Sequence, residues 1–249
     1  MPLQTYELGA GEGTPVVCLH GVTGHGRRFA DLAGALPGRR VVGVDLRGHG
    51  ASTFLPPWSV EQHLADLVEA AGALGAEDAV WLGHSFGGRL VVELAHRHPD
   101  LVERAVLLDP ALFIEPPVAL ERSELLRADT SFATPDEAIE ARLADGSLFT
   151  TPRAILEHEA DTHLELGEDG RFRWRFSTPA VTVAWSIMAS EPPHWPHCET
   201  LVVTGERSWI PIRVPRLATI RHVVVPGGHS VLWDDFDATA TAIADFLAS

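Results

Sequence analysis

The sequence predicts an α/β fold in which helices flank a mostly parallel, doubly wound sheet that carries an inserted, mainly helical cap. Three observations predict this fold. Short apolar segments alternate with longer amphipathic ones. One apolar segment ends in a glycine-rich turn around a serine, and a helical pattern follows at once. One long interval, residues 110–200, breaks the alternation and has helix signals of its own.

Six apolar segments are expected to form the central strands. They are rich in leucine and β-branched residues and are bounded by Gly, Pro or Asp, as is typical of parallel strands buried on both faces. An antiparallel edge strand is expected at residues 3–8, and helices are expected at 59–74, 87–98 and 236–247. The six central segments are 16–19, 40–44, 79–82, 104–108, 201–204 and 221–225.

The interval after the fourth central strand is expected to form a cap. A structureless loop of that length would be unusual in a compact domain. We therefore expect an α/β core made of residues 1–110 and 199–249, with residues 111–198 inserted as a cap that is not an independent domain.

Local signals support helices and one strand inside this interval. Thr134-Pro135-Asp136-Glu137 combines an N-cap threonine, a first-turn proline and a capping-box glutamate. Thr151-Pro152 marks a second helix start, and residues 179–188 have helical spacing. Phe172, Trp174 and Phe176 alternate with arginines, which predicts a strand.

Composition narrows the class of protein. The chain has 34 acidic and 19 basic residues and a net charge of -15, which disfavours binding to nucleic acid. Its two cysteines do not form a disulfide framework. Neither a signal peptide nor an apolar segment of about 20 residues, the length that crosses a bilayer, is apparent. We expect a cytoplasmic protein with a small-molecule partner and no membrane or nucleic-acid partner. The sequence does not define its oligomeric state.

The segment Gly83-His84-Ser85-Phe86-Gly87 fits the G-x-S-x-G pattern of a nucleophile elbow. In such an elbow the serine is held in a strained turn between strand and helix. Its neighbours two residues away must therefore lack side chains. The strand and helix patterns on either side agree with this arrangement, so Ser85 is predicted to be a nucleophile.

Two further segments supply groups that such a serine needs. Acyl transfer requires backbone N–H groups directed at the developing oxyanion, and we expect these from Val22 and Phe86. His229 lies on the loop after the last strand, where a base can reach the elbow. The chain order of serine first and histidine last is typical of this type of site.

Together these residues resemble the α/β-hydrolase superfamily over nearly the whole chain. The resemblance covers the His20-Gly21 turn, residues 45–52, the Ser85 elbow, residues 107–110, Gly205-Glu206 and Gly228-His229. Within the superfamily the chain is similar to small capped single-domain hydrolases. The resemblance implies cleavage of a small or medium ester, thioester or lactone through an acyl-enzyme on Ser85, without a cofactor.

The acid of the expected triad is the open point. The superfamily usually places it after the next-to-last strand as Gly-x-x-Asp, and Ser208 stands at that position here. We predict that Asp109, after the strand that follows the elbow, takes this role. Glu206 is an alternative, as are Asp234 and a site without an acid.

Cap residues are expected to form the substrate pocket, and Phe113, Trp185 and Met188 are the candidates. Each is also an ordinary core residue type. No metal site is expected, since the histidine-rich segments lack carboxylate or cysteine partners at ligand spacing. The sequence contains neither a dinucleotide-binding glycine motif after a strand nor a P-loop.

Two other functions stay open. The same site can cleave carbon–carbon bonds or act as a lyase on a carboxylated substrate. Polar and arginine groups that face Ser85 from the cap would favour this reaction, whereas an apolar cap surface would favour an esterase. A non-catalytic ligand-binding or signalling protein of the same fold is the third alternative.

Overall fold

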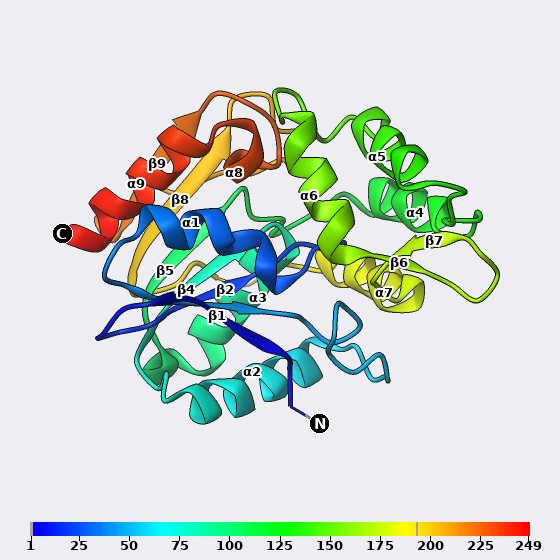
Figure 1. The fold of residues 1–249 in the computed structure, drawn as a ribbon. Helices are drawn as coiled ribbons and strands as arrows, with labels where there is room; N and C mark the ends of the chain where they lie inside the picture. The colour runs from blue at the N-terminus through cyan, green and yellow to red at the C-terminus, as the bar shows by residue number, and fades with distance from the viewer. Residues whose placement is uncertain (1, 193) are drawn as a thin grey trace.

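The computed structural model describes residues 2–192 and 194–249. Its centre is a seven-stranded sheet with the order β1-β3-β2-β4-β5-β8-β9 (Figure 1). β1 pairs antiparallel with β3, and the other neighbours are parallel. The strands are β1 (Thr5–Ala10), β2 (Val16–Leu19), β3 (Arg40–Val44), β4 (Ala79–His84), β5 (Val102–Leu108), β8 (Glu199–Gly205) and β9 (Ile220–Val225).

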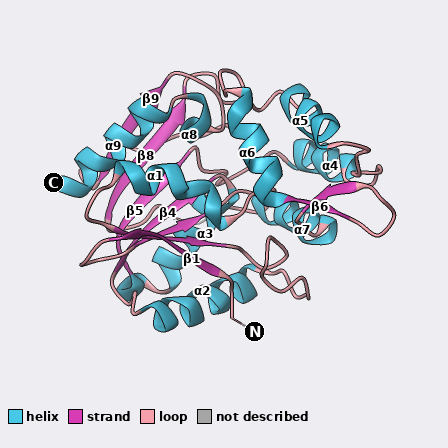
Figure 2. Cartoon of the chain, viewed as in Figure 1, coloured by secondary structure: helices cyan, strands magenta, loops and turns pink. Residues whose placement is uncertain are grey.

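Helices cover both faces of this sheet, as Figures 1 and 2 show. α2 (Val60–Leu74) and α3 (Phe86–Arg97) pack on one face, while α1 (Ala30–Ala35) and α9 (Phe236–Ala248) pack on the other. Short helical segments η1 (Gly26–Phe29), η2 (Pro99–Leu101) and α8 (Val231–Asp234) complete the connections. The predicted doubly wound α/β class is confirmed.

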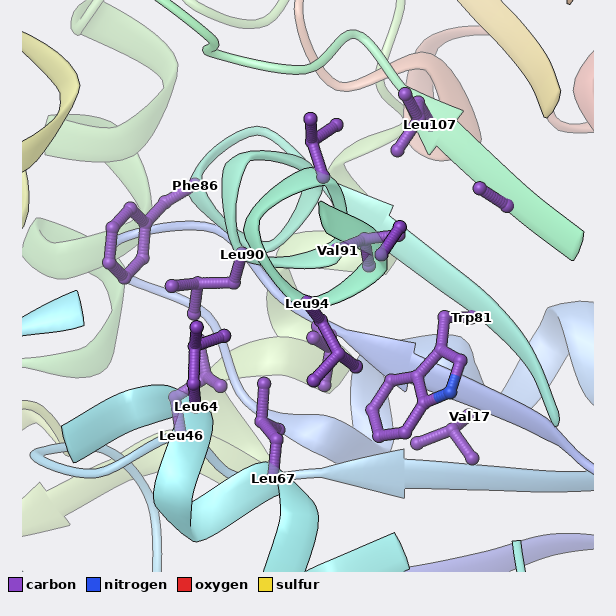
Figure 3. Packing of buried hydrophobic residues seen from close by; sticks show 14 of the residues in the cluster. Val17, Leu46, Leu64, Leu67, Trp81, Phe86, Leu90, Val91, Leu94 and Leu107 are labelled. Atoms are coloured by element: carbon purple, nitrogen blue, oxygen red, sulfur yellow. The ribbon is translucent and has the colours of Figure 1, made fainter. Parts of the chain in front are cut away.

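Successive side chains of each strand point to opposite faces of the sheet and so belong to two separate apolar layers. Trp81 of β4 lies in the layer under α2 and α3, while its neighbour Leu82 lies in the layer under α1 and α9. Figure 3 shows the first layer, in which Leu90 and Leu94 of α3 lie near Leu64 and Leu67 of α2. These side chains are at most 2% exposed. Dense packing therefore fixes the position of α3, the helix that follows the elbow serine.

The predicted strands and helices agree with the structure to within a few residues at their ends. The edge strand begins two residues later than expected, at Thr5, and continues to Ala10 opposite β3. The helix expected at 59–74 starts after Ser59, whose hydroxyl accepts a hydrogen bond from the Gln62 N–H. It ends at Leu74, and Gly75, which has φ 62°, caps it.

The chain between β5 and β8 forms a group of helices at one end of the sheet (Figure 1). It contains α4 (Pro116–Leu125), α5 (Pro135–Ala144), α6 (Arg153–His163), β6 (Leu164–Leu166), β7 (Phe172–Trp174) and α7 (Thr178–Met188). The Thr134 cap is present, since its hydroxyl accepts from the Glu137 N–H at 3.2 Å. α4 lacks a clear sequence signal and was not expected.

One detail of the predicted strand in this insert differs. β7 ends at Trp174, and Phe176 instead forms an isolated antiparallel bridge with His49 of the loop after β3. A small apolar cluster of the insert includes Trp233 from α8. The insert and the sheet domain therefore share backbone pairing and apolar contacts.

Candidate active site

The strand order changes direction between β2 and β4. From β2 the chain moves outward to β3, whereas from β4 it moves the other way through β5 and β8. In open α/β sheets, ligands bind at the carboxyl ends of strands where this reversal occurs. Gly21 and Ser85 follow those two ends, and a Cβ on Gly21 would lie 3.1 Å from the Ser85 Cβ.

The elbow serine has the strained backbone that the glycine pattern predicted. Ser85 has φ 55° and ψ -117°, a backbone conformation that residues other than glycine rarely adopt. A Cβ on Gly83 would approach the Gly87 carbonyl carbon to 2.4 Å. A Cβ on Gly87 would meet the Leu19 carbonyl oxygen at 2.3 Å. The glycines are therefore required by crowding between β4, α3 and β2.

Ser85, His229 and Asp109 form a continuous hydrogen-bonded chain. His229 Nδ1 donates to Asp109 Oδ2 at 2.5 Å, and His229 Nε2 lies 2.9 Å from Ser85 Oγ. Ser85 is 4% exposed, His229 9% and Asp109 0%. Because the carboxylate holds the Nδ1 proton, Nε2 is left to accept the serine proton.

The Asp109 carboxylate is held by groups at the end of the neighbouring strand β8. Its Oδ1 accepts from the Gly205 N–H at 3.2 Å, and its Oδ2 accepts from Ser208 Oγ at 2.5 Å. Ser208, the residue at the expected acid position, thus binds the carboxylate from β5. In the described chain, Asp109 and Ser85 are the two residues other than glycine with positive φ. Backbone strain therefore coincides with this site.

The two alternative candidates for the triad acid, Glu206 and Asp234, make other contacts. Glu206 is exposed, and its backbone N–H bonds to the Val225 carbonyl. Asp234 Oδ2 accepts from the Gly228 N–H at 2.6 Å, and its Oδ1 accepts from Thr151 Oγ1 at 2.6 Å. Asp234 therefore joins the loop before His229 to the insert.

Buried histidines brace the loops around the serine. His20 Nε2 accepts from the Leu46 N–H at 3.0 Å, so its Nδ1 donates to the Gly21 carbonyl at 2.7 Å. His84 Nε2 donates to the His229 carbonyl at 3.0 Å. Burial lowers the pKa of both His20 and His84 well below the ordinary value. Both rings stay neutral and act as fixed hydrogen-bonding struts.

The two residues expected to supply oxyanion donors come from two different segments, the turn after β2 and the start of α3. Phe86 is the first residue of α3, where backbone N–H groups have no partner within the helix. Val22 lines the cavity in front of Ser85, and its carbonyl accepts from His49 Nε2 at 2.7 Å. That hydrogen bond fixes the peptide that follows β2.

A cavity of about 140 Å³ opens in front of Ser85 and His229. Trp185, one of the predicted pocket residues, lines it. Met188 is fully buried in the main core, and Phe113 is half-buried; neither lines the cavity. The lining residues that sequence reasoning missed include Arg28, Arg122, Arg142, Trp209 and Trp233. These five come from separate elements, so no local pattern marks them.

Two features are absent from the described residues. No three or more His, Cys, Asp or Glu side chains there lie close enough together to hold a metal ion. None of the helices described is both long and apolar enough to cross a membrane.

Comparison with known sequences identifies relatives. A family model described as alpha/beta hydrolase fold matches residues 14–145. Lipase LipV of Mycobacterium tuberculosis is 36% identical over 176 residues, which are 71% of this chain and 67% of LipV. Esterase YbfF of Escherichia coli is 26% identical, with 94% of this chain and 93% of that protein aligned. The chain spans only 58 to 60% of the sn-1-specific diacylglycerol lipases of Danio rerio and Mus musculus that it also matches.

Solved structures show the same fold over the full length. The structure of E-2-(acetamidomethylene)succinate hydrolase superposes with a TM-score of 0.82 and 26% identity. The match covers 99% of this chain and 95% of that chain. The similarity thus includes the inserted helices as well as the sheet.

Proposed function

Because this chain belongs to the alpha/beta hydrolase fold family and is a hydrolase, we propose that it cleaves a small or medium ester, thioester or lactone through an acyl-enzyme on Ser85. The observation that carries the proposal is the hydrogen-bonded chain from Ser85 Oγ through His229 to Asp109. Relatives named lipase and esterase support an ester as the substrate class.

In the proposed reaction His229 Nε2 removes the proton from Ser85 Oγ as that oxygen attacks the substrate carbonyl carbon. The tetrahedral intermediate then expels the alcohol, thiol or lactone oxygen, which takes the proton from His229. Water attacks the acyl-enzyme, again with His229 as the base. The acid leaves, and the proton returns to Ser85 Oγ.

Three groups assist these steps in the proposal. Asp109 keeps the imidazole of His229 in the tautomer that accepts at Nε2 and stabilises the imidazolium that forms. Backbone N–H groups of Val22 and Phe86 stabilise the oxyanion. Each such donor is worth about 10²-fold or more in kcat in comparable sites.

The insert of residues 111–198 is proposed to act as a cap that covers the substrate on a core of residues 1–110 and 199–249. α4, α5 and α7 of this segment contribute lining residues to the cavity beside Ser85. A cytoplasmic location and the absence of nucleic-acid partners stay predictions from composition.

A second candidate is a carbon–carbon bond hydrolase or lyase that acts on a carboxylated substrate. Arg122 and Arg142 of the insert line the cavity, which is the feature that favours this reaction. The name of one solved relative states a succinate derivative, which is a dicarboxylate. The Ser85–His229 contact supports either reaction over a purely ligand-binding role.

A panel of chromogenic esters of increasing acyl length tests the proposal. We expect the wild type to hydrolyse the shorter esters, since the cavity is small, and Ser85→Ala to lose about 10⁴-fold or more of kcat. Ser123→Ala is the matched control, because its hydroxyl donates only within α4, to the Ala119 carbonyl. Full activity of Ser85→Ala would contradict the proposal. So would a wild type that hydrolyses none of the esters.

A further inference from the structure

We propose that Arg122 and Arg142 bind a carboxylate that the substrate carries away from its scissile bond, so that the preferred substrates are anionic esters. The inference rests on the proposed function, since it places the carboxylate beside the reacting Ser85. It goes further by assigning a substrate class and two specificity-determining residues.

The charge of the cavity is opposite to the charge of the molecule. The chain has 34 acidic and 19 basic residues, so acidic side chains outnumber basic ones in the molecule as a whole. The described lining of the cavity contains Arg28, Arg122 and Arg142 but one carboxylate, Asp145. A local excess of arginine in an acidic protein attracts anions to this point.

Arg142 of α5 is a guanidinium with donors to spare. It donates to Thr23 Oγ1 at 3.2 Å and to the Thr23 carbonyl at 3.1 Å, and it lies 4.6 Å from the centre of the Trp174 ring. It takes part in none of the ion pairs of the described residues. A guanidinium has five N–H donors, so several stay available to a ligand.

The charge of Arg142 persists at neutral pH although part of its environment is apolar. Burial lowers the pKa of Arg142 to about 10. Among the groups packed around it, Arg28 contributes to this lowering, while Glu159 and Asp145 oppose it. A partly desolvated cation without a carboxylate partner gains from a bound anion.

Arg122 of α4 approaches the site from a second side. Its guanidinium lies 5.0 Å from the centre of the Trp209 ring, and Trp209 packs edge-on against His229 at 5.8 Å. Arg122 is half-buried and forms no ion pair within the described chain. Stacking on an aromatic face leaves the edge of a guanidinium free to bind a planar carboxylate.

Unpartnered buried donors give independent support for a ligand. Trp209 Nε1 and Arg28 Nε are both buried and find no hydrogen-bond partner in the described chain. Both residues line this cavity. The Arg28 side chain is 9% exposed, and its NH2 group pairs with Glu159 of α6. Buried polar atoms without partners are rare in native proteins. Two of the four in the described chain belong to residues that line this cavity, which supports a polar ligand there, while the other two, Trp58 Nε1 and His163 Nε2, lie elsewhere.

The size of the cavity and the form of the donors favour a carboxylate on a short chain. Arginine binds carboxylates through two parallel hydrogen bonds. A cavity of about 140 Å³ holds a chain of a few carbon atoms with one such group. The carboxylate does not react. The ester of a dicarboxylic acid and water give the dicarboxylate, the alcohol and one proton.

Matched esters that differ in one group test this assignment. Monomethyl succinate is compared with methyl butyrate, and O-acetylglycolate with propyl acetate, by titration of the released acid. In at least one pair we expect the wild type to have about tenfold to hundredfold higher kcat/KM for the anionic ester, mostly through a lower KM. Arg122→Met and Arg142→Met are expected to bring the ratio of kcat/KM between the anionic and the neutral ester close to one, while Arg142→Lys keeps part of the preference.

Arg27→Met is the matched control for charge. Arg27 is the exposed neighbour of Arg28, lies over the Tyr6 ring and is not part of the lining of this cavity. It is expected to keep the full preference for the anionic ester. Equal kcat/KM within both pairs would overturn the inference. A preference that Arg27→Met reduces as much as Arg122→Met does would also overturn it.

A binding measurement separates this inference from the proposed function. In Ser85→Ala, succinamate and butyramide are titrated against the fluorescence of the cavity tryptophans. We expect succinamate to bind about tenfold tighter or more, and Arg122→Met and Arg142→Met in the same background to remove the difference. Tighter succinamate binding in a chain that hydrolyses no ester would support the subsite and overturn the hydrolase proposal. Hydrolysis of neutral esters without tighter succinamate binding would support the hydrolase proposal and overturn the carboxylate subsite.

Discussion

The strand ends of the sheet and the inserted helices meet around one cavity, but they hold their side chains in place by different means. Ser85 and Asp109 directly follow β4 and β5, next to backbone that is buried and hydrogen-bonded on both sides. The insert is joined to the sheet domain by one backbone bridge, by apolar contacts of Trp233, and by side-chain contacts such as Glu159 with Arg28 and Arg142 with Thr23.

This difference suggests a division of tasks. Side chains that follow parallel strands inherit the rigidity of the sheet, which suits groups that must keep a fixed distance to a proton. Side chains on the inserted helices line the same cavity but do not follow strands of the sheet. We infer that the strand ends define the reaction and that the insert defines which substrate reaches it.

The largest expected effect tests the strand ends. Asp109→Asn is expected to lower kcat by about 10⁴-fold, because an amide does not stabilise the imidazolium of His229. Adding Ser208→Asp to this variant is expected to restore part of the loss. Ser208 Oγ already lies 2.5 Å from the Asp109 carboxylate oxygen that binds His229. Steady-state hydrolysis of a short ester measures both effects.

The control for this pair is Ser208→Asp alone, which keeps Asp109 in place. Near-normal turnover of Asp109→Asn would show that the reaction does not depend on this carboxylate. The strand ends would then not account for the chemistry by themselves.

The next effect tests how the insert is held. Burial raises the pKa of the Glu159 carboxyl, but Arg28, His25 and Arg142 outweigh it and keep the pKa well below the ordinary value. The group is therefore ionised in the folded chain above its unfolded pKa. Glu159→Gln leaves buried positive charge without its partner and is expected to reduce the free energy of unfolding by about 3 kcal/mol. Urea unfolding measures this change.

Glu157→Gln is the matched control on the same helix. Glu157 pairs with Arg153 at 3.1 Å, and its side chain is 55% exposed. Loss of an exposed pair of this kind is expected to change the free energy of unfolding by less than about 1 kcal/mol. Equal effects of the two variants would mean that the buried cluster does not hold the insert.

The last comparison concerns the pH dependence of stability and takes one buried histidine from each region. Burial lowers the pKa of His63 on α2 to about 4 and that of His163 on α6 to about 2. Below the ordinary value of 6.5, the unfolded chain binds protons that the folded chain does not, so stability falls as the pH falls. His63→Gln is expected to reduce this slope by up to about 1.4 kcal/mol per pH unit between pH 6.5 and pH 4.

His163→Gln is expected to reduce the same slope and to extend the reduction below pH 4, since its pKa is lower. Urea unfolding at a series of pH values measures both variants. An unchanged slope in both would show that these rings do not remain neutral in the folded chain.

Sequence reasoning reached further in the sheet domain than in the insert. The buried strands, the elbow at Ser85 and the position of His229 all depend on local patterns that are strongly periodic or punctuated by glycine. α4 lacks such a pattern, and Phe176 pairs with His49 rather than extending its strand. A contact between distant segments leaves no periodic trace in either of them.

What the sequence determined by itself is the layered α/β architecture and the placement of a serine and a histidine at strand ends, because hydrophobic period and turn chemistry are local properties. Tertiary structure alone decided that Asp109 contacts His229 while Ser208 supports it, and that Arg28, Arg122 and Arg142 surround one cavity. These side chains come from strands and helices far apart in the chain. Their distances are set by how the strands pair and how the insert packs, and neither is encoded in spacing along the chain.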